Sequence, residues 1–215
     1  MMYRPFSPLA AVALVAALAG TLSGCVPLVL GGAAVSAMVA VDRRTSGAQL
    51  EDEGIELRGA SRLRDAFGAA AHINITSYNR QVLLTGEVPE DAARQRAEQI
   101  VSRVENVRSI VNELAIGGTS TLVQRSSDAL ITGKVKASLV DARDLYAGAF
   151  KVVTESSVVY LMGRVTQAEA DRATGIARQV SGVRRVVRIF EILDVDELRR
   201  IQTQAAPTAP ASAPP

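Results

Sequence analysis

The sequence is poor in the side chains that most enzymes use. Its 215 residues include one cysteine, one histidine and no tryptophan, and only 4% of them are aromatic. A single cysteine excludes an intramolecular disulfide and any metal centre built from cysteines alone. A single histidine, His72, leaves most zinc sites and most general-base mechanisms without their usual residue. We therefore expect a protein that is not an enzyme, with no metal site and no cofactor.

Motifs of catalysis and of phosphate binding are missing as well. No serine lies in the Gly-x-Ser-x-Gly arrangement of hydrolases, and Gly31-Gly32 is not followed by the Lys-Ser or Lys-Thr of a phosphate-binding loop. We expect His72 to lie at the surface or to have its hydrogen bonds met by neighbours. Asp52, Glu53 and Glu56 form an acidic cluster, which we expect to be a solvated face ahead of the first folded module. No residue is assigned a catalytic role.

The amino terminus has the features of a bacterial export signal. Arg4 is followed by an apolar run over residues 9–19, which is shorter than the roughly 20 residues needed to cross a bilayer. Leu22-Ser23-Gly24-Cys25 resembles the lipobox of bacterial lipoproteins, in which the signal peptide is cut off before an acylated cysteine. The resemblance implies a signal peptide over residues 1–24, acyl chains on Cys25 and a Gly/Ala/Val-rich leader over residues 25–49.

The alternative for this region is an uncleaved membrane helix, since apolar residues continue as far as Val41. Pro27 would break a helix there, which favours the lipoprotein. Position 26 is valine and not the aspartate that retains enterobacterial lipoproteins in the inner membrane. The resemblance therefore implies a lipid anchor in the outer membrane, with the protein facing the periplasm.

Two stretches of the chain repeat one pattern at an offset of 76 or 77 positions. Residues 82–88 recur as residues 159–165, and residues 96–111 match residues 172–187. Each copy predicts a helix, a two-stranded hairpin, a second helix and a closing strand. The expected elements lie at 61–71, 73–77, 82–85, 91–103 and 109–114 in the first copy, and at 127–141, 150–154, 158–162, 167–180 and 186–193 in the second. Asn79-Arg80 and Ser156-Ser157 are the expected hairpin turns. The sequence thus predicts an α/β fold, an α+β sandwich of two tandem αββαβ modules that pack against each other.

These copies resemble the BON domain family. The resemblance rests on Gly86 and Gly163 at the ends of strands and on the Val-x-x-Val turn after the second helix of each copy, and it covers residues 50 to 194. It implies a first BON domain at 50–117, a linker at 118–125 and a second BON domain at 126–195. Residues 196–215 form an extension whose Ala/Pro-rich tail is expected to be flexible. Gly86 and Gly163 are expected to be structural turn glycines with positive φ.

The two copies differ in charge, which suggests different partners. Residues 50–117 carry a net charge of −3, and residues 126–202 carry +2. In the first helix of the second copy, Ser127 or Asp128 is expected as the N-cap. Ile131, Val135 and Leu139 share one face and are expected to be buried, which leaves Leu130, Lys134 and Lys136 outside. An exposed apolar residue beside two lysines suits an anionic lipid surface.

The family resemblance implies the same contact. Dual-BON lipoproteins bind anionic phospholipid, such as phosphatidylglycerol or cardiolipin, through this helix, and they carry tryptophan where this chain has Leu130. The expected lipid-binding residues are Leu130, Thr132, Lys134, Lys136 and Val140. The resemblance also implies a role in envelope integrity, with outer-membrane assembly or division proteins as partners and no nucleic acid. Two alternatives stay open: a solvated helix with two ordinary lysines, and a periplasmic protein–protein adaptor that recognises no specific lipid.

Overall fold

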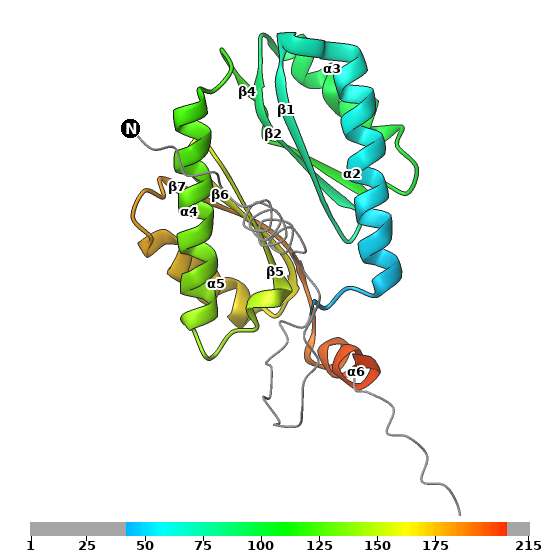
Figure 1. The fold of residues 1–215 in the computed structure, drawn as a ribbon. Helices are drawn as coiled ribbons and strands as arrows, with labels where there is room; N and C mark the ends of the chain where they lie inside the picture. Colours follow the sequence, from blue (N-terminus) through cyan, green and yellow to red (C-terminus); the bar gives the residue numbers. More distant parts are fainter. Residues whose placement is uncertain (1–41, 206–215) are drawn as a thin grey trace, which may run out of the picture. The chain divides into compact units, whose positions relative to one another are not determined.

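A computed structural model describes residues 42–205. The expected signal peptide, Cys25 and the Ala/Pro-rich tail from residue 206 lie outside these residues. The described part divides into the two predicted copies, followed by one further helix (Figure 1). The second copy has the order αββαβ, and the first has the same order with a short additional strand, β4, at its end. The predicted fold class, an α+β sandwich of two tandem modules, is confirmed.

The first module forms one sheet with two helices against it. Its elements are α2 (Ser46–Phe67), β1 (His72–Tyr78), β2 (Gln81–Val88), α3 (Asp91–Ser102), β3 (Ser109–Asn112) and β4 (Ala115–Ile116). Strand β1 is antiparallel to β2, and β3 and β4 are both parallel to β2. The parallel pairing follows from the crossover helix α3, which returns the chain to the same end of the sheet before each closing strand.

The second module repeats this arrangement. Its elements are α4 (Leu122–Asp141), β5 (Phe150–Glu155), β6 (Val158–Val165), α5 (Gln167–Gln179) and β7 (Arg185–Ile192). Strand β5 is antiparallel to β6, and β7 is parallel to β6. A final helix, α6 (Val195–Ala205), follows β7 and forms the start of the expected carboxy-terminal extension.

Both hairpin turns lie where the sequence predicts them. Asn79 and Arg80 have φ angles of 50° and 65°, and Ser156 and Ser157 have 49° and 62°. Two successive positive φ angles match the two-residue turns whose twist suits an antiparallel hairpin. Non-glycine residues adopt this conformation at a cost, so the surrounding contacts must hold the turns in place.

A buried aspartate in the first helix of each module supplies those contacts. Asp128 accepts hydrogen bonds from the backbone N–H groups of Ser156 and Ser157, both at 2.8 Å. Asp52 does the same for the other turn, accepting from the N–H groups of Asn79 and Arg80 at 2.7 Å. Asp52 is only 2% exposed and Asp128 only 5%.

Two sequence-based expectations about these aspartates are therefore wrong. Asp52 is not part of a solvated face, because its helix α2 begins at Ser46, well before residue 61, and carries Asp52 over the hairpin turn. Neither Ser127 nor Asp128 caps α4, which begins at Leu122. Its N-cap is Thr121, which exchanges hydrogen bonds with Gln124 in a capping box.

The two sheets pack against each other through the faces that their helices leave free. In β2, Val82 and Leu84 face the helices of the first module, while Leu83 faces the second module. This third hydrophobic cluster, which joins the modules, consists of Tyr78, Leu83, Val158, Tyr160, Met162 and Ile189. Strands that are covered on both faces read as continuous apolar runs, which explains the unbroken sequences of β2 and β6. The prediction that the modules pack together is confirmed.

The glycine at the end of each hairpin's second strand makes room for a neighbouring carbonyl. A Cβ on Gly86 would lie 2.0 Å from the backbone oxygen of His72, and φ of Gly86 is +110°. A Cβ on Gly163 would lie 2.4 Å from the backbone oxygen of Ala149, but Gly163 does not have a positive φ. The close approach of the backbone just before β5, rather than a turn, therefore requires glycine at Gly163, and the expected positive φ is wrong there.

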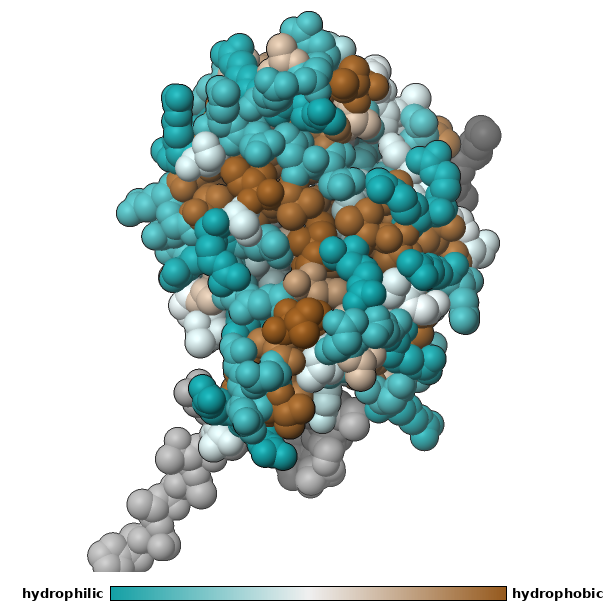
Figure 2. Space-filling model, turned by 180° about the vertical axis from the view of Figure 1, so that it is seen from behind, coloured by the Kyte–Doolittle hydropathy of each residue, from teal (hydrophilic) through white to brown (hydrophobic). Residues whose placement is uncertain are grey.

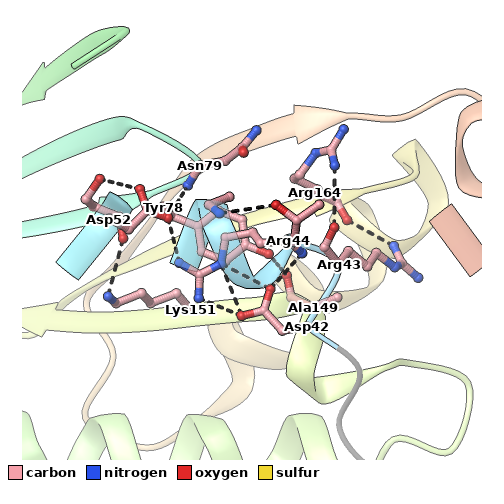
Figure 3. A network of polar contacts seen from close by, with 12 residues as sticks. Asp42, Arg43, Arg44, Asp52, Tyr78, Asn79, Ala149, Lys151 and Arg164 are labelled. Atoms are coloured by element: carbon pink, nitrogen blue, oxygen red, sulfur yellow. Dashed lines mark hydrogen bonds and ion pairs between the residues drawn. The ribbon is translucent and has the colours of Figure 1, made fainter. Parts of the chain in front are cut away.

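The segment that enters the folded part ties the modules together (Figure 3). Arg43 is 6% exposed and donates to both carboxylate oxygens of Glu169 in the second module, at 2.8 and 2.6 Å. Arg44 turns to the first module, donating to Asp52 at 2.7 Å and lying over the ring of Tyr78. Burial of the Glu169 carboxyl opposes its ionisation, but the contacts with Arg43 and Thr166 together outweigh burial and lower the pKa of Glu169. Successive arginines thus bind opposite modules.

Candidate functional site: the outward face of helix α4

One face of α4 is fixed by the core of the second module. Ile131, Val135 and Leu139 are at most 3% exposed and belong to its hydrophobic cluster. The prediction that these three residues are buried is confirmed. Because successive residues of an α-helix are turned by about 100°, burying this stripe turns the opposite side of the helix away from the sheet.

The side of α4 that faces away from the sheet is apolar. Leu130 and Val140 are 68% and 67% exposed. Three further residues on this side have small side chains or none and are also exposed: Ala129, Gly133 and Ala137. We call these five residues the outward face of α4. None of the five residues is charged, and the one charged residue of α4 in the same sector is Asp141 at the end of the helix. The solvent side of an amphipathic helix ordinarily carries more charges.

Two lysines border this face. From the helical period, Lys134 and Lys136 lie about 160° apart around the axis, measured across the outward face. All five residues of the face lie in the arc between them. Both lysines are exposed, and within residues 42–205 neither forms an ion pair. Their ammonium groups are therefore available on either edge of an apolar strip.

Thr132 is the expected site residue that the structure does not bring to this face. It is half-buried, and its hydroxyl donates to Thr154 Oγ1 on β5 at 2.7 Å. This bond holds α4 against the sheet. Of the expected residues, Leu130 and Val140 lie on the outward face, Lys134 and Lys136 lie at its edges, and Thr132 lies outside it.

The sequence-based analysis missed two apolar residues at the start of the helix. Leu122 and Val123 are 78% and 79% exposed and belong to the first turn of α4. Both were assigned to the linker between the modules. The signal was the capping box Thr121-x-x-Gln124, which marks the start of a helix directly before these residues. With them, exposed apolar side chains occur near both ends of α4.

The other basic cluster of the second module is engaged in structural contacts. Arg185 forms an ion pair with Glu113 at 3.1 Å, and Arg188 with Asp171 at 2.9 Å. Arg184 donates to the backbone oxygen of Ser156 at 3.0 Å. These arginines brace β7 and the hairpin turn, in contrast to the two lysines on α4.

Apolar surface also occurs elsewhere. On the side opposite to the view of Figure 1, apolar side chains form a broken band between hydrophilic margins (Figure 2). Exposed hydrophobic side chains are common on soluble proteins and need no explanation by themselves. What distinguishes α4 is the combination of a continuous apolar face with an unpaired lysine on each edge.

The first module carries a groove of a different kind, between α2 and α3. It has a volume of about 520 Å³. Its lining consists of three arginines, one aspartate, one glutamine and two apolar residues: Arg62, Arg96, Arg103, Asp65, Gln99, Ala66 and Ile100. Among the residues that the structure describes, none of the three arginines is paired with a carboxylate. We call this the arginine groove. In the repeat, the second module has serine, arginine and glutamine at the corresponding positions.

No helix within residues 42–205 is long and apolar enough to cross a membrane. The described part is a two-module α/β protein with an exposed apolar helix face, bordered by lysines and without a catalytic constellation. Comparison with known proteins identifies it further. The model of the BON domain matches residues 56–118 and 127–194. The chain belongs to the BON domain family, with two copies of the domain.

The relatives are bacterial proteins of similar size. The chain is 39% identical over 191 residues to the outer membrane lipoprotein DolP of Haemophilus influenzae, covering 87% of this chain and 98% of that protein. It is 37% identical over 152 residues to a 21 kDa hemolysin of Actinobacillus pleuropneumoniae, covering 70% and 78%. It is 31% identical over 117 residues to the osmotically-inducible protein Y of Escherichia coli, covering 53% and 58%. None of these three names is that of an enzyme, and the chain is a dual-BON relative of an outer membrane lipoprotein.

Proposed function

We propose that this protein is an outer-membrane lipoprotein, anchored through acyl chains on Cys25 and facing the periplasm, that contacts anionic phospholipid through the outward face of α4 and helps to maintain the envelope. The observation that carries the proposal is the apolar face of α4 with an unpaired lysine on each edge. The lipobox sequence at Cys25 and the similarity to a lipoprotein of the outer membrane support the anchor.

The magnitudes suit a protein that is already held at the membrane. Each lysine near an anionic surface contributes about 1 kcal/mol. Full burial of a leucine such as Leu130 contributes roughly 1.5–3 kcal/mol. Contacts of this size give weak binding in free solution, but acyl chains on Cys25 would hold α4 at high effective concentration near lipid. The α4 contact would then orient the protein on the membrane rather than attach it.

The family resemblance implies tryptophan in a related lipoprotein at the position of Leu130. Leucine can enter the acyl region, but it lacks the preference of tryptophan for the membrane–water interface. The neighbouring residues Ala129 and Ala137 are small, so Leu130 and Val140 can approach the lipid closely. We therefore expect binding that depends more on charge than on insertion of one large side chain.

Vesicle binding tests the proposal. All residues of the three hydrophobic clusters lie within residues 42–205, so a chain that begins at residue 42 keeps the core and removes the lipid anchor. This chain is expected to sediment with phosphatidylglycerol vesicles and not with phosphatidylcholine vesicles. Lys134→Glu with Lys136→Glu removes about 2 kcal/mol of attraction and adds repulsion, so binding is expected to weaken about 30-fold or more.

The matched control is Arg62→Glu with Arg64→Glu, two exposed cations at the same spacing on α2. This pair changes the net charge equally and is expected to leave vesicle binding nearly unchanged. If both pairs weaken binding equally, net charge rather than the α4 face determines the interaction. If neither pair weakens it, the proposed site is wrong.

The arginine groove favours a second candidate function, that of a protein–protein adaptor. Three guanidinium groups against the single carboxylate of Asp65 give the groove a positive charge, which suits an extended acidic segment of a partner protein. A fluorescent hexaglutamate peptide is the probe. Arg96→Ser with Arg103→Ser is expected to weaken its binding about tenfold, whereas Arg172→Ser with Arg178→Ser on the second module is expected to leave it unchanged. Equal binding by all three proteins would rule out this candidate.

A further inference from the structure

Three side chains that can bind a metal ion meet where the two modules pack together. His72 begins β1 and Glu87 lies near the end of β2, both in the first module, while Glu155 ends β5 in the second. One possible ligand atom from each side chain lies within 4.8 Å of the other two. Nδ1 of His72 is 3.0 Å from Oε2 of Glu87. Glu87 and Glu155 are 6% and 8% exposed, so two carboxylates are buried beside one imidazole.

Neighbouring groups fix the orientation of both carboxylates. Asn74 donates to Oε2 of Glu155 at 2.9 Å, and the backbone N–H of Ser120 donates to Oε2 of Glu87 at 3.0 Å. Oε1 of each carboxylate accepts no hydrogen bond from residues 42–205. Supporting hydrogen bonds to one oxygen, with the other oxygen available, are typical of carboxylates that bind metal ions.

Neither buried carboxylate forms an ion pair with an arginine or a lysine of residues 42–205. Arg125 approaches, but its guanidinium is occupied by Ser120, donating to Oγ at 3.2 Å and to the backbone oxygen at 3.0 Å. Two carboxylates that repel each other in a buried place are stabilised when a cation lies between them.

A cavity of about 280 Å³ opens beside the cluster and gives an ion access to it. His72, Asn74 and Glu155 form part of its lining, together with Arg125 and Thr154. Gly86 contributes indirectly, because the absence of a Cβ there lets the backbone of His72 approach β2. The space is large enough for a metal ion together with water molecules as further ligands.

We propose that His72, Glu87 and Glu155 form a zinc-binding site that joins the two modules. One imidazole nitrogen and two carboxylate oxygens are ligands that zinc accepts, and a water molecule in the fourth position completes the tetrahedral geometry. Calcium is a poor match, since it takes six to eight oxygen ligands. Because Glu155 comes from one module and the other two ligands come from its neighbour, bound zinc would hold the modules together.

Calorimetric titration with zinc chloride tests the proposal on the untagged full chain in nonionic detergent. The wild-type protein is expected to bind one equivalent of zinc, and calcium chloride is expected to give no saturable binding. Glu155→Gln still accepts the hydrogen bond from Asn74 but loses the charge, so zinc affinity is expected to fall by about tenfold at the least. His72→Gln is expected to weaken binding in the same way.

The matched control is Glu56→Gln, which removes a carboxylate that bridges the modules elsewhere, through Lys151 at 2.8 Å. It is expected to bind zinc as the wild type does. Zinc is also expected to raise the melting temperature of the wild type and of Glu56→Gln, but not that of Glu155→Gln. The proposal is overturned if the wild type shows no saturable zinc binding, if calcium binds equally well, or if Glu155→Gln and His72→Gln bind zinc like the wild type.

Discussion

Helices α2 and α4 occupy the same place in their modules, yet their outward surfaces differ in charge. At the repeat offset of 76 positions, the buried residues correspond closely, with Asp52, Ile55 and Leu63 matching Asp128, Ile131 and Leu139. On the outward face the correspondence ends. Glu53, Ser61 and Arg64 of α2 stand where α4 has Ala129, Ala137 and Val140.

The charged residues of the two helices differ in number and also in whether they form ion pairs. Arg58 of α2, which corresponds to Lys134, forms an ion pair with Glu51 at 2.9 Å. Lys134 has no such partner among residues 42–205. The inward positions are constrained by packing and by the hairpin turn, whereas the outward positions are free to diverge after duplication. We therefore expect the two modules to differ in function through the outward residues of α2 and α4.

The largest expected effect concerns what the modules share, the glycines at the end of the second strand. Gly86→Ala brings a Cβ against the backbone of His72 and also places alanine at a positive φ. Gly163→Ala meets only the first of these obstacles. We expect losses in unfolding free energy of about 3 kcal/mol or more for Gly86→Ala and of less for Gly163→Ala. Urea denaturation measures both, and equal midpoints for Gly86→Ala and the wild type would contradict the account.

The buried aspartates give the next largest effect. Asp52 also accepts from Ser77 Oγ at 2.6 Å and from Arg44, contacts that Asp128 lacks. In Asp52→Asn, one carboxylate oxygen is replaced by an NH₂ group, which cannot accept the hydrogen bonds that this oxygen accepts. The substitution is therefore expected to lower the unfolding free energy by about 2–3 kcal/mol. Asp128→Asn is expected to cost less. Denaturation of the two variants at neutral pH measures this difference, and the reverse ranking would contradict it.

The effect of Asp52 depends on pH with a definite sign. Burial opposes ionisation of Asp52, but its hydrogen bonds, led by that from Ser77, outweigh burial and lower its pKa below the ordinary value of 3.8. Its contribution is therefore present in full above pH 3.8 and is lost as the pH falls through the lower, folded-state pKa. The difference in stability between wild type and Asp52→Asn is expected to shrink in that acid range. A difference that stays constant down to pH 2 would argue against an ionised Asp52.

Exchanging outward residues between the helices tests the comparison itself. Ala129→Glu with Val140→Arg gives α4 two residues of α2, and binding to phosphatidylglycerol vesicles is expected to weaken about tenfold, since apolar burial is lost. The reciprocal exchange, Glu53→Ala with Arg64→Val, is expected to leave the binding through α4 intact. Circular dichroism checks that both proteins keep their fold. Undiminished binding by the first variant would mean that the outward face of α4 does not contact lipid.

The smallest expected effect comes from Leu130→Trp. This substitution adds a side chain that prefers the membrane interface, so vesicle binding is expected to become tighter. The change in affinity is expected to be smaller than the roughly tenfold change from Ala129→Glu with Val140→Arg. Tryptophan is otherwise absent from the chain, so its fluorescence reports directly on the site. An emission maximum that does not move when phosphatidylglycerol vesicles are added would place Leu130 outside the contact.

Much of the fold could be predicted from the sequence, because each pattern occurs in both copies of the repeat and the two copies can be compared. The hairpins, the second helices and the buried stripe of α4 each follow from apolar periodicity or from turn residues seen twice. The start of α2 could not be found in this way. Its first turns contain few apolar residues, and Asp52 reads as solvated unless it is compared with Asp128, the other aspartate at the same place in the repeat.

The candidate site was predictable only in part. Leu130, Lys134 and Lys136 follow from helical spacing once the buried face is known, and Thr132 does not, because its hydrogen bond to Thr154 depends on tertiary packing. The cluster around His72 lay beyond sequence reasoning. Glu155 is far from His72 in the chain and comes from the other module, so only the packing of the two sheets brings the side chains together.

The most direct test of the central claim is to follow the amide resonances of residues 42–205 by NMR while phosphatidylglycerol micelles are added, with zwitterionic micelles as the control. The account predicts selective shifts over residues 122–140 of α4, weakened by salt, and no comparable shifts over residues 46–67 of α2. Shifts of equal size on both helices, or none with anionic micelles, would contradict the assignment of lipid contact to α4.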